Sequence, residues 1–193
     1  VYFALTLAIE GMVLISLVSL DILLFYVFFE AMLIPMYFLI GGFGGNRTGE
    51  GNDEDRAKRS AAAVKFLLYN LFGGLIMLAA VVGLYVATAG SDAFAAGTFD
   101  FRAIVAAVAS GEFVVNPMVM HLLFGGFMFA FAVKAPLWPL HRWLPDSAVE
   151  ATPASAVLMM AIMDKVGTFG MIRYCLQLFP DSAIYFSPLI ITL

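Results

Sequence analysis

Long apolar stretches separated by short polar segments define the pattern of this chain. Residues 66–90 carry no charged side chain, and residues 113–133 carry none besides the ionisable His121. A membrane-spanning helix needs about 20 mainly apolar residues, so each stretch predicts one transmembrane helix. The pattern as a whole predicts an all-α fold, a polytopic transmembrane helix bundle.

The first 44 residues are apolar except for Glu10, Asp21 and Glu30, and they are too long for a single crossing. The sequence Ser-Leu-Asp at 19–21 predicts a turn that divides them. We predict helices near residues 2–19, 22–43, 61–90, 113–138 and 152–178, and the start of another at 182–193. The chain begins and ends inside apolar runs, so we expect residues 1–193 to form one partial transmembrane domain, an internal piece of a longer membrane protein.

Two polar loops interrupt the apolar pattern, at residues 44–60 and 91–112. The second contains the segment FDFRAIVAAVASGEF, which is typical of a short amphipathic helix at a membrane surface. Five basic residues lie in the first loop and at the helix start after it, namely Arg47, Arg56, Lys58, Arg59 and Lys65. The second loop carries only Arg102, so the positive-inside rule predicts that 44–60 is cytoplasmic and 91–112 is outside. Counting crossings then places residues 141–146 in the cytoplasm.

Composition agrees with lipid as the solvent. The chain is 63% hydrophobic and only 12% charged, whereas soluble domains are about 25% charged. The net charge of −4 offers no basic surface for nucleic acid. The single cysteine, Cys175, excludes an internal disulfide framework. No metal-ligand, phosphate-loop or nucleophile motif is present, so we expect no metal or cofactor in this chain.

Glu30 lies in the middle of a predicted span, within the sequence FYVFFEAMLIPM. A charge at that depth costs about 2.5–3.5 kcal/mol on insertion scales and normally faces the interior of a bundle. Glu30 is either part of a structural ion pair or a carboxylate that handles protons, and its depth favours the second interpretation. Pro35 removes the hydrogen bond to the carbonyl of Ala31 and predicts a kink beside the acid.

Lys134 follows a long apolar run in the sequence FAVKAPLWPLHRWLPDS. Pro136 and Pro139 lack backbone donors, so they predict a broken helix near residues 134–140 and free carbonyls at Ala132 and Ala135. Irregular backbone at membrane depth is tolerated where protein or a water-filled cavity covers it. Lys134 is therefore either a proton carrier at a hydrated break or a lysine that extends to the cytoplasmic surface.

Lys165 lies midway in the predicted span 152–178, directly after Asp164. It is too deep to extend to either membrane surface, so we expect it to be buried in protein or water. Adjacent helical residues project about 100° apart, so Asp164 and Lys165 do not face each other. His141 is either a proton relay, through either ring nitrogen, or a surface histidine of a cytoplasmic turn.

Four segments occur in an order that resembles a known family: VFFEAMLIPMYFLIG, KFLLYNLFGG, FAVKAPLWPLHRWLPD and MDKVGTFGMIRYCL. They are similar to the antiporter-like membrane subunits of respiratory NADH–quinone oxidoreductase (complex I). The similarity is greatest to subunit M, the counterpart of the mitochondrial fourth NADH dehydrogenase subunit. LHRWLPD is shared with the multisubunit cation/proton antiporters, whereas FFEAMLIPM is more specific to subunit M. The resemblance covers nearly the whole chain except the two polar loops.

The resemblance implies an antiporter-like fold of fourteen transmembrane helices in two inverted five-helix repeats, of which this chain holds the fourth to eighth and the start of the ninth. The residues it implies for proton translocation are Glu30, Lys134, Lys165 and His141, with Asp21 and Asp164 as accessory candidates. We expect Glu30 and Lys134 to lie within ion-pair or one-water distance, because both are costly alone. Two departures stand out: Ala148 replaces a second histidine, and Asp164 stands where relatives often have an apolar residue.

The implied function is proton translocation, as a membrane subunit of the redox-driven enzyme NADH–quinone oxidoreductase. NADH, flavin, iron–sulfur clusters and quinone are expected in partner subunits. The expected partners are other membrane subunits of complex I, including neighbouring antiporter-like subunits, and the lipid bilayer. We expect a multi-pass protein of the bacterial inner membrane. The alternatives are a subunit of a multisubunit sodium/proton antiporter and a scaffold subunit whose charges only hold helices together.

Overall fold

The computed structural model describes residues 1–45 and 53–192, which fold into helices joined by turns. The first 110 residues contain α1 (Tyr2–Val18), α2 (Ile22–Ala31), α3 (Leu33–Phe43), α4 (Asp53–Ala89) and α5 (Phe101–Ser110). The rest of the chain contains α6 (Pro117–Lys134), the short helix η1 (Leu140–Trp143), α7 (Leu144–Glu150), α8 (Pro153–Val157), η2 (Leu158–Met163), α9 (Asp164–Gly170), η3 (Met171–Cys175), α10 (Leu176–Leu178) and α11 (Pro180–Ile191). The all-α prediction is confirmed.

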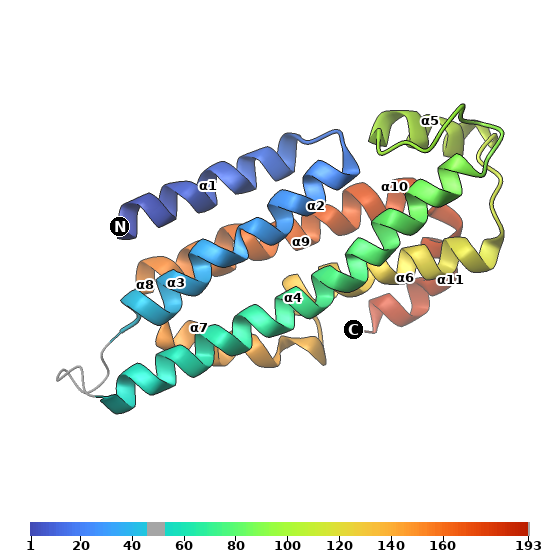
Figure 1. The fold of residues 1–193 in the computed structure, drawn as a ribbon. Helices are drawn as coiled ribbons and strands as arrows, with labels where there is room; N and C mark the ends of the chain where they lie inside the picture. The colour runs from blue at the N-terminus through green and yellow to red at the C-terminus, as the bar shows by residue number, and fades with distance from the viewer. Residues whose placement is uncertain (46–52, 193) are drawn as a thin grey trace.

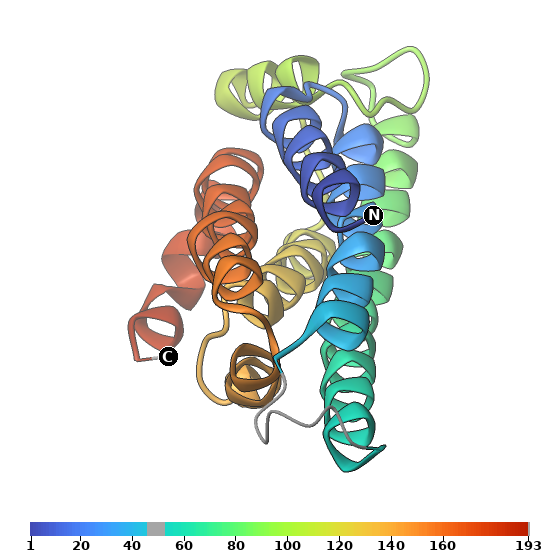
Figure 2. The ribbon, with the colours of Figure 1, turned by 90° about the vertical axis from the view of Figure 1, so that its left-hand side faces the viewer.

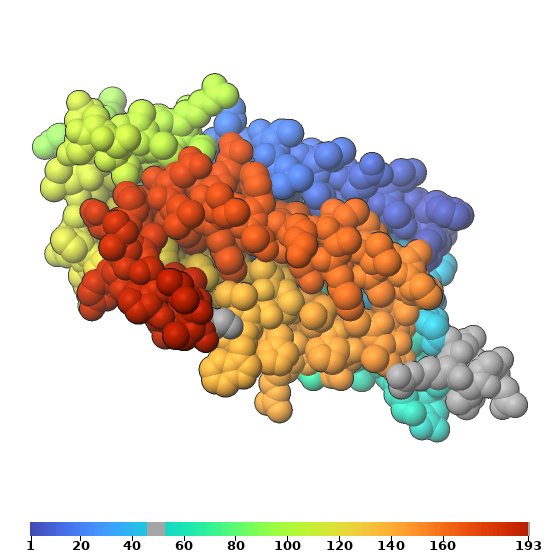
Figure 3. Space-filling model, turned by 180° about the vertical axis from the view of Figure 1, so that it is seen from behind, coloured from blue at the N-terminus to red at the C-terminus, as the bar shows by residue number. Residues whose placement is uncertain are grey.

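Four helical stretches in the described part of the chain are long and apolar enough to cross a membrane: Ile22–Phe43, Asp53–Ala89, Pro117–Lys134 and Pro153–Leu178. The long helix α4 runs along the whole bundle, with α5 across one end and α7 at the other (Figure 1). Viewed from one end, α6 lies between α4 and the stretch that contains α9 (Figure 2). From behind, that stretch runs along the surface in orange (Figure 3). The bundle therefore has α6 at its centre and α9 on an outer face.

Short polar side chains set two of the predicted helix starts. Asp21 caps α2, because its Oδ1 accepts a hydrogen bond from the Leu24 N–H at 2.7 Å. Asn116 caps α6 in the same way and is followed by Pro117, a residue suited to the first helical position. The Asp21 cap separates α1 from α2 at the predicted turn. The Asn116 cap starts α6 at Pro117, slightly later than the apolar pattern indicated.

The prediction of a loop over residues 44–60 is wrong for its last part, because α4 begins at Asp53 rather than near residue 61. Acidic residues at 53–55 occupy the first turn of α4. Negative side chains there stabilise the positive end of the helix dipole. This signal outweighs the polar composition that suggested a loop. The rest of that predicted loop, at 46–52, lies outside the described residues.

The remaining polar segments lie at opposite ends of the bundle. The Nζ of Lys65 in α4 lies 2.5 Å from the Oδ2 of Asp146 in α7, so the N-terminal part of α4 and α7 share one end. Helix α5 lies at the other end (Figure 1). It buries Phe101, Ile104 and Ala107 against the bundle, as an amphipathic helix does. The assignment of the α5 end to the outside stays a prediction.

The break predicted near residues 134–140 is confirmed. Helix α6 ends at Lys134, short of the predicted residue 138, because the prolines that follow cannot continue the backbone hydrogen bonds. The carbonyl of Ala132 is not free as expected, since the Leu137 N–H donates to it at 2.9 Å. The break is thus a compact turn in which part of the backbone forms hydrogen bonds.

Candidate functional site

The ammonium group of Lys134 lies inside the bundle, at the point where α6 ends. Lys134 is only 3% exposed. Its Nζ donates a hydrogen bond to the backbone carbonyl of Phe29 at 2.7 Å and lies 4.0 Å from the centroid of the Phe29 ring. Phe29 belongs to the last turn of α2, where carbonyls lack intrahelical partners. The interpretation of Lys134 as a lysine that extends to the membrane surface is therefore wrong.

The carboxylate of Glu30 is enclosed beside Lys134. Both carboxylate oxygens are buried without a hydrogen-bond partner among the described residues. They lie against Gly74 of α4, in the space that a side chain at that position would fill. Glu30 and Lys134 both face away from lipid, as predicted, and their charges interact. They form no direct ion pair in the described part of the chain, so a separation bridged by one water stays a prediction.

The helix that holds Glu30 is interrupted for one residue where the kink was predicted, and the kink itself stays a prediction. The backbone leaves the regular helix at Met32, between α2 and α3, three residues before Pro35. Proline removes the hydrogen bond to the residue one turn earlier and so favours a kink there. Two helix breaks, one after α2 and one after α6, therefore meet at the Lys134 side chain.

Helix α9 presents Asp164 and Lys165 in different directions. Asp164 is 8% exposed and belongs to the buried side of α9 together with Gly167. A side-chain carbon at Gly167 would lie only 3.2 Å from the Cβ of Lys134, so this side of α9 packs on the end of α6. Lys165 is exposed instead. Its expected burial in protein or water within the membrane stays a prediction, because the structure describes the contacts of this chain alone.

Two π-helical segments flank α9. η2 ends directly before Asp164, and η3 begins directly after Gly170. Such segments are rare and frequently mark functional sites, because each changes the direction of the side chains that follow. No proline lies within either segment, so the sequence analysis had no signal for them.

His141 and Asp21 lie away from the cluster of Glu30, Lys134 and Asp164. His141 is half-buried in η1, and in the described residues no hydrogen bond joins its ring to Lys134. Asp21 is exposed and caps the opposite end of α2 from Glu30. The structure thus brings together three of the six candidate residues.

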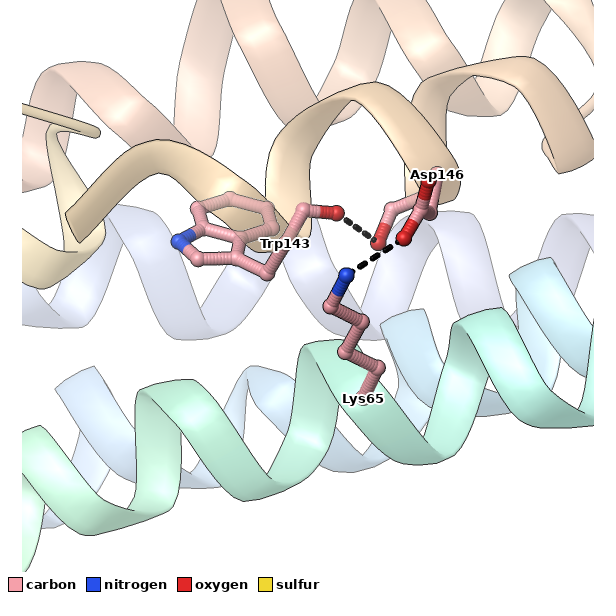
Figure 4. Close-up of polar contacts among 4 residues, drawn as sticks. Lys65, Trp143 and Asp146 are labelled. Carbon is pink, nitrogen blue, oxygen red and sulfur yellow. Dashed lines mark hydrogen bonds and ion pairs between the residues drawn. The ribbon is translucent and has the colours of Figure 1, made fainter. Parts of the chain in front are cut away.

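Two long-range contacts hold the broken segment, and the sequence analysis missed both. The indole Nε1 of Trp143 donates to the carbonyl of Val133 at 3.0 Å, and its ring packs edge-on against Phe66 with centroids 5.3 Å apart. Lys65 and Asp146 form the ion pair described above, beside Trp143 (Figure 4). The partners lie too far apart in the sequence for any local pattern to indicate them.

The groups gathered at the break are amines and carboxylates, which exchange protons. Charges in a region of low dielectric interact strongly, so moving one proton changes the energy of its neighbours. In the residues that the structure describes, no set of three or more His, Cys, Asp or Glu side chains is arranged to hold a metal ion.

Comparison with known proteins agrees with this geometry. The family described as NADH:quinone oxidoreductase/Mrp antiporter, TM, matches residues 19–193. NADH-quinone oxidoreductase subunit M of Mycobacterium tuberculosis (strain ATCC 25618 / H37Rv) is 72% identical over 192 residues, which cover 100% of this chain and 32% of the relative. This chain therefore spans about a third of that relative's length.

Two solved structures share the fold. Respiratory complex I from Thermus thermophilus with bound NADH contains a chain with 33% identity and a TM-score of 0.79, covering 97% of this chain and 35% of that chain. The Mrp complex from Dietzia sp. DQ12-45-1b contains one with 23% identity and a TM-score of 0.70, covering 94% of this chain and 30% of that chain. With its broken helix and membrane-spanning stretches, the chain belongs to the NADH:quinone oxidoreductase/Mrp antiporter transmembrane family.

Proposed function

We propose that this chain is part of a proton-translocating membrane subunit of a redox-driven NADH–quinone oxidoreductase. The observation that carries the proposal is Lys134, an amine only 3% exposed at a helix break inside a membrane-spanning bundle. A charge at such a depth is costly and normally marks an ion path. Lysine, unlike arginine, is able to lose its proton. The relative named NADH-quinone oxidoreductase subunit M supports the same function.

The break gives Lys134 two positions for its proton. Beside Glu30, the ammonium form is held by the carboxylate charge and by the Phe29 carbonyl. Away from Glu30, the ammonium loses that attraction in a region of low dielectric and releases its proton more readily. In this proposal, His141 exchanges protons with the cytoplasmic end and Lys165 carries them onward. Asp21 supports the path by capping the helix that holds Glu30.

The redox chemistry belongs to partner subunits in this proposal. NADH, flavin, iron–sulfur clusters and quinone are bound there, and this chain receives the energy of electron transfer through neighbouring membrane subunits. The Thermus thermophilus relative is part of such an assembly with bound NADH. We place the protein in the bacterial plasma membrane as a multi-pass subunit, with the lipid bilayer around it.

Replacing Lys165 by arginine tests the proposed function. Arginine keeps the positive charge, but its reference pKa lies about two or more units above that of lysine, so its neutral form is roughly 100-fold rarer. We expect the complex to assemble and NADH-driven proton uptake into inverted membrane vesicles to fall by a similar factor. The readout is the initial quenching rate of a pH-sensitive dye, with assembly checked on native gels.

The matched control is Lys58→Arg, because the Lys58 side chain is 53% exposed and pairs with Glu54 at the surface. The control is expected to take up protons at the native rate. An assembled Lys165→Arg complex that also does so would exclude a relay role and favour a scaffold subunit.

Replacing Gly74 by alanine is expected to move the Glu30 carboxylate without unfolding the bundle. The added methyl group would overlap the carboxylate carbon and both oxygens, which lie at the end of a flexible side chain and are free to turn away. We expect stability to change by about 1 kcal/mol or less, while proton uptake falls several-fold. Gly125→Ala is the control, since its methyl group meets nothing within 4 Å. Equal uptake rates in the two variants would show that the position of Glu30 is unimportant.

A second candidate function is a subunit of a multisubunit sodium/proton antiporter, because the matched family also includes Mrp antiporters. The two functions differ in their energy source. Proton uptake that follows NADH oxidation in sodium-free buffer supports the oxidoreductase. Uptake that requires a sodium gradient and ignores NADH supports the antiporter.

A further inference from the structure

Asp164 is a buried carboxylate to which the proposed path from Lys134 to Lys165 gives no role. It lies within Pro153–Leu178, a stretch long enough to cross the membrane, and is only 8% exposed. A carboxylate at such a depth is costly unless it has a partner or a function. Its neighbour in sequence, Lys165, is turned about 100° away on the helix and is exposed.

Glycines bring the Asp164 side of α9 against the end of α6. A side-chain carbon at Gly167 would lie 3.0 Å from the backbone nitrogen of Ala135, and one at Gly170 would overlap the Phe131 ring. Asp164 lies one turn before Gly167 on this buried side. Helical side chains tilt toward the N-terminus of their helix, so the Asp164 carboxylate is directed along the break that follows α6.

Lys134 consequently stands between two carboxylates from different helices. Glu30 approaches from α2, and Asp164 approaches from α9. The charge of Lys134 interacts with both, and the charge of Asp164 interacts with both Lys134 and Lys165. No direct ion pair joins Asp164 to either lysine in the described part of the chain. Lys134 therefore interacts with a second carboxylate charge, which comes from a different helix than Glu30.

We propose that Asp164 is a relay carboxylate that takes the proton from Lys134 and passes it to Lys165. This inference rests on the proposed function and adds one step to it. In the first transfer an N–H bond of the Lys134 ammonium breaks as an O–H bond forms on Asp164. In the second transfer that O–H bond breaks as an N–H bond forms on the neutral Lys165 amine. Asp164 ends as a carboxylate again, so the step needs no co-reactant.

A carboxylate at this position affects both the charge along the path between the two lysines and the direction from which the proton reaches Lys165. Direct exchange between the two amines offers the moving positive charge no counter-charge between them. It also requires Lys165 to turn toward α6, away from the face it occupies. Asp164 is buried on the Lys134 side of α9 and is adjacent to Lys165 in the chain, so it divides the transfer into two steps, the second of which requires the Lys165 side chain to turn.

The test replaces Asp164 in the full-length protein within the assembled complex. Asp164→Asn keeps the size of the side chain and one acceptor oxygen but removes its basicity. Asp164→Leu is a second neutral variant, because leucine is well accepted in membrane helices. Asp164→Glu keeps the carboxylate. Asp92→Asn is the matched control, because Asp92 is exposed in the loop after α4.

We expect both neutral variants to lower NADH-driven proton uptake by at least about ten-fold, as loss of a proton-transfer group does. The Glu variant should recover most of the rate, and the Asp92→Asn control should match the native complex. The uptake rate in inverted vesicles is divided by the amount of assembled complex. A residue needed only for assembly would then give equal normalised rates in all of the variants.

Three results overturn the inference: an assembled neutral variant that pumps at the native rate, a Glu variant as slow as the Asn variant, or failure of both neutral variants to assemble. Lys134→Met and Lys165→Arg are measured alongside. Loss of uptake in those two with native uptake in Asp164→Asn refutes only the role of Asp164. Native uptake in all of them refutes the proposed function itself.

Discussion

Replacing Lys134 by methionine is expected to abolish NADH-driven proton uptake and to destabilise the bundle. Methionine is flexible and fills a similar volume, so packing around α6 is largely kept. The Glu30 carboxylate, however, loses its buried counter-charge. Breaking a direct buried pair costs about 3 kcal/mol or more, and we expect a smaller loss here because the two charges interact without direct contact. Uptake stops because the amine that accepts and releases the proton is gone. Vesicle uptake rates and the thermal midpoint of the purified complex measure the two effects.

A double variant separates transport from stability. Adding Glu30→Gln to Lys134→Met removes the uncompensated carboxylate, and replacing both members of a buried pair is often nearly neutral. The double variant should therefore regain stability and still fail to pump. Lys58→Met is the surface control and should change stability by less than about 1 kcal/mol. Native uptake in the Lys134→Met complex would contradict the central role of this lysine.

Replacing Trp143 by alanine is expected to give the largest loss of stability, about 3–5 kcal/mol. Trp143 is 1% exposed and packs edge-on against Phe66 of α4. The substitution leaves a cavity and removes the hydrogen bond to the Val133 carbonyl, at the last turn of α6 before the break. The broken segment then loses its main attachment to α4. Heat-induced loss of assembled complex, followed on native gels, measures the effect.

Two further substitutions separate the effect of the Trp143 hydrogen bond on stability from the effect of burying its ring. Trp143→Phe keeps a ring against α4 and loses only the hydrogen bond, so it should cost about 1–3 kcal/mol. Trp138→Ala changes the other tryptophan of the same segment, which is 64% exposed, and should cost within about 0.5 kcal/mol. Equal stability of the Trp143→Ala and Trp138→Ala variants would show that burial of Trp143 does not hold the break.

Local sequence patterns predicted much of the fold. The apolar runs predicted the membrane-spanning stretches, because a helix that faces lipid has to be apolar over a fixed length. The prolines after Lys134 predicted the break, because proline lacks the donor that a helix needs. The start of α4 was missed for a local reason: polar residues at 53–60 suggested a loop, although the acidic first turn favoured a helix.

The candidate site shows the limit of such patterns. Depth in a span indicated that Glu30, Lys134 and Lys165 are costly charges, and this is a property of each residue and its neighbours in sequence. Depth did not indicate that this chain encloses Lys134 and leaves Lys165 exposed. That difference depends on the rotation of α6 and α9 about their axes, which the glycine contacts and the π-helical segments set.

The sequence by itself therefore determined the class of fold, the approximate positions of the apolar helices, the break after α6 and the set of charges placed in the membrane. These follow from short-range chemistry: helix length, apolar content and the missing donor of proline. Only the tertiary structure decided that Gly74 makes room for the Glu30 carboxylate and that Trp143 fastens the break to α4. It also decided that Asp164, rather than Lys165, faces Lys134. These contacts join residues far apart in the chain, and their existence depends on helix packing, which no local window of sequence contains.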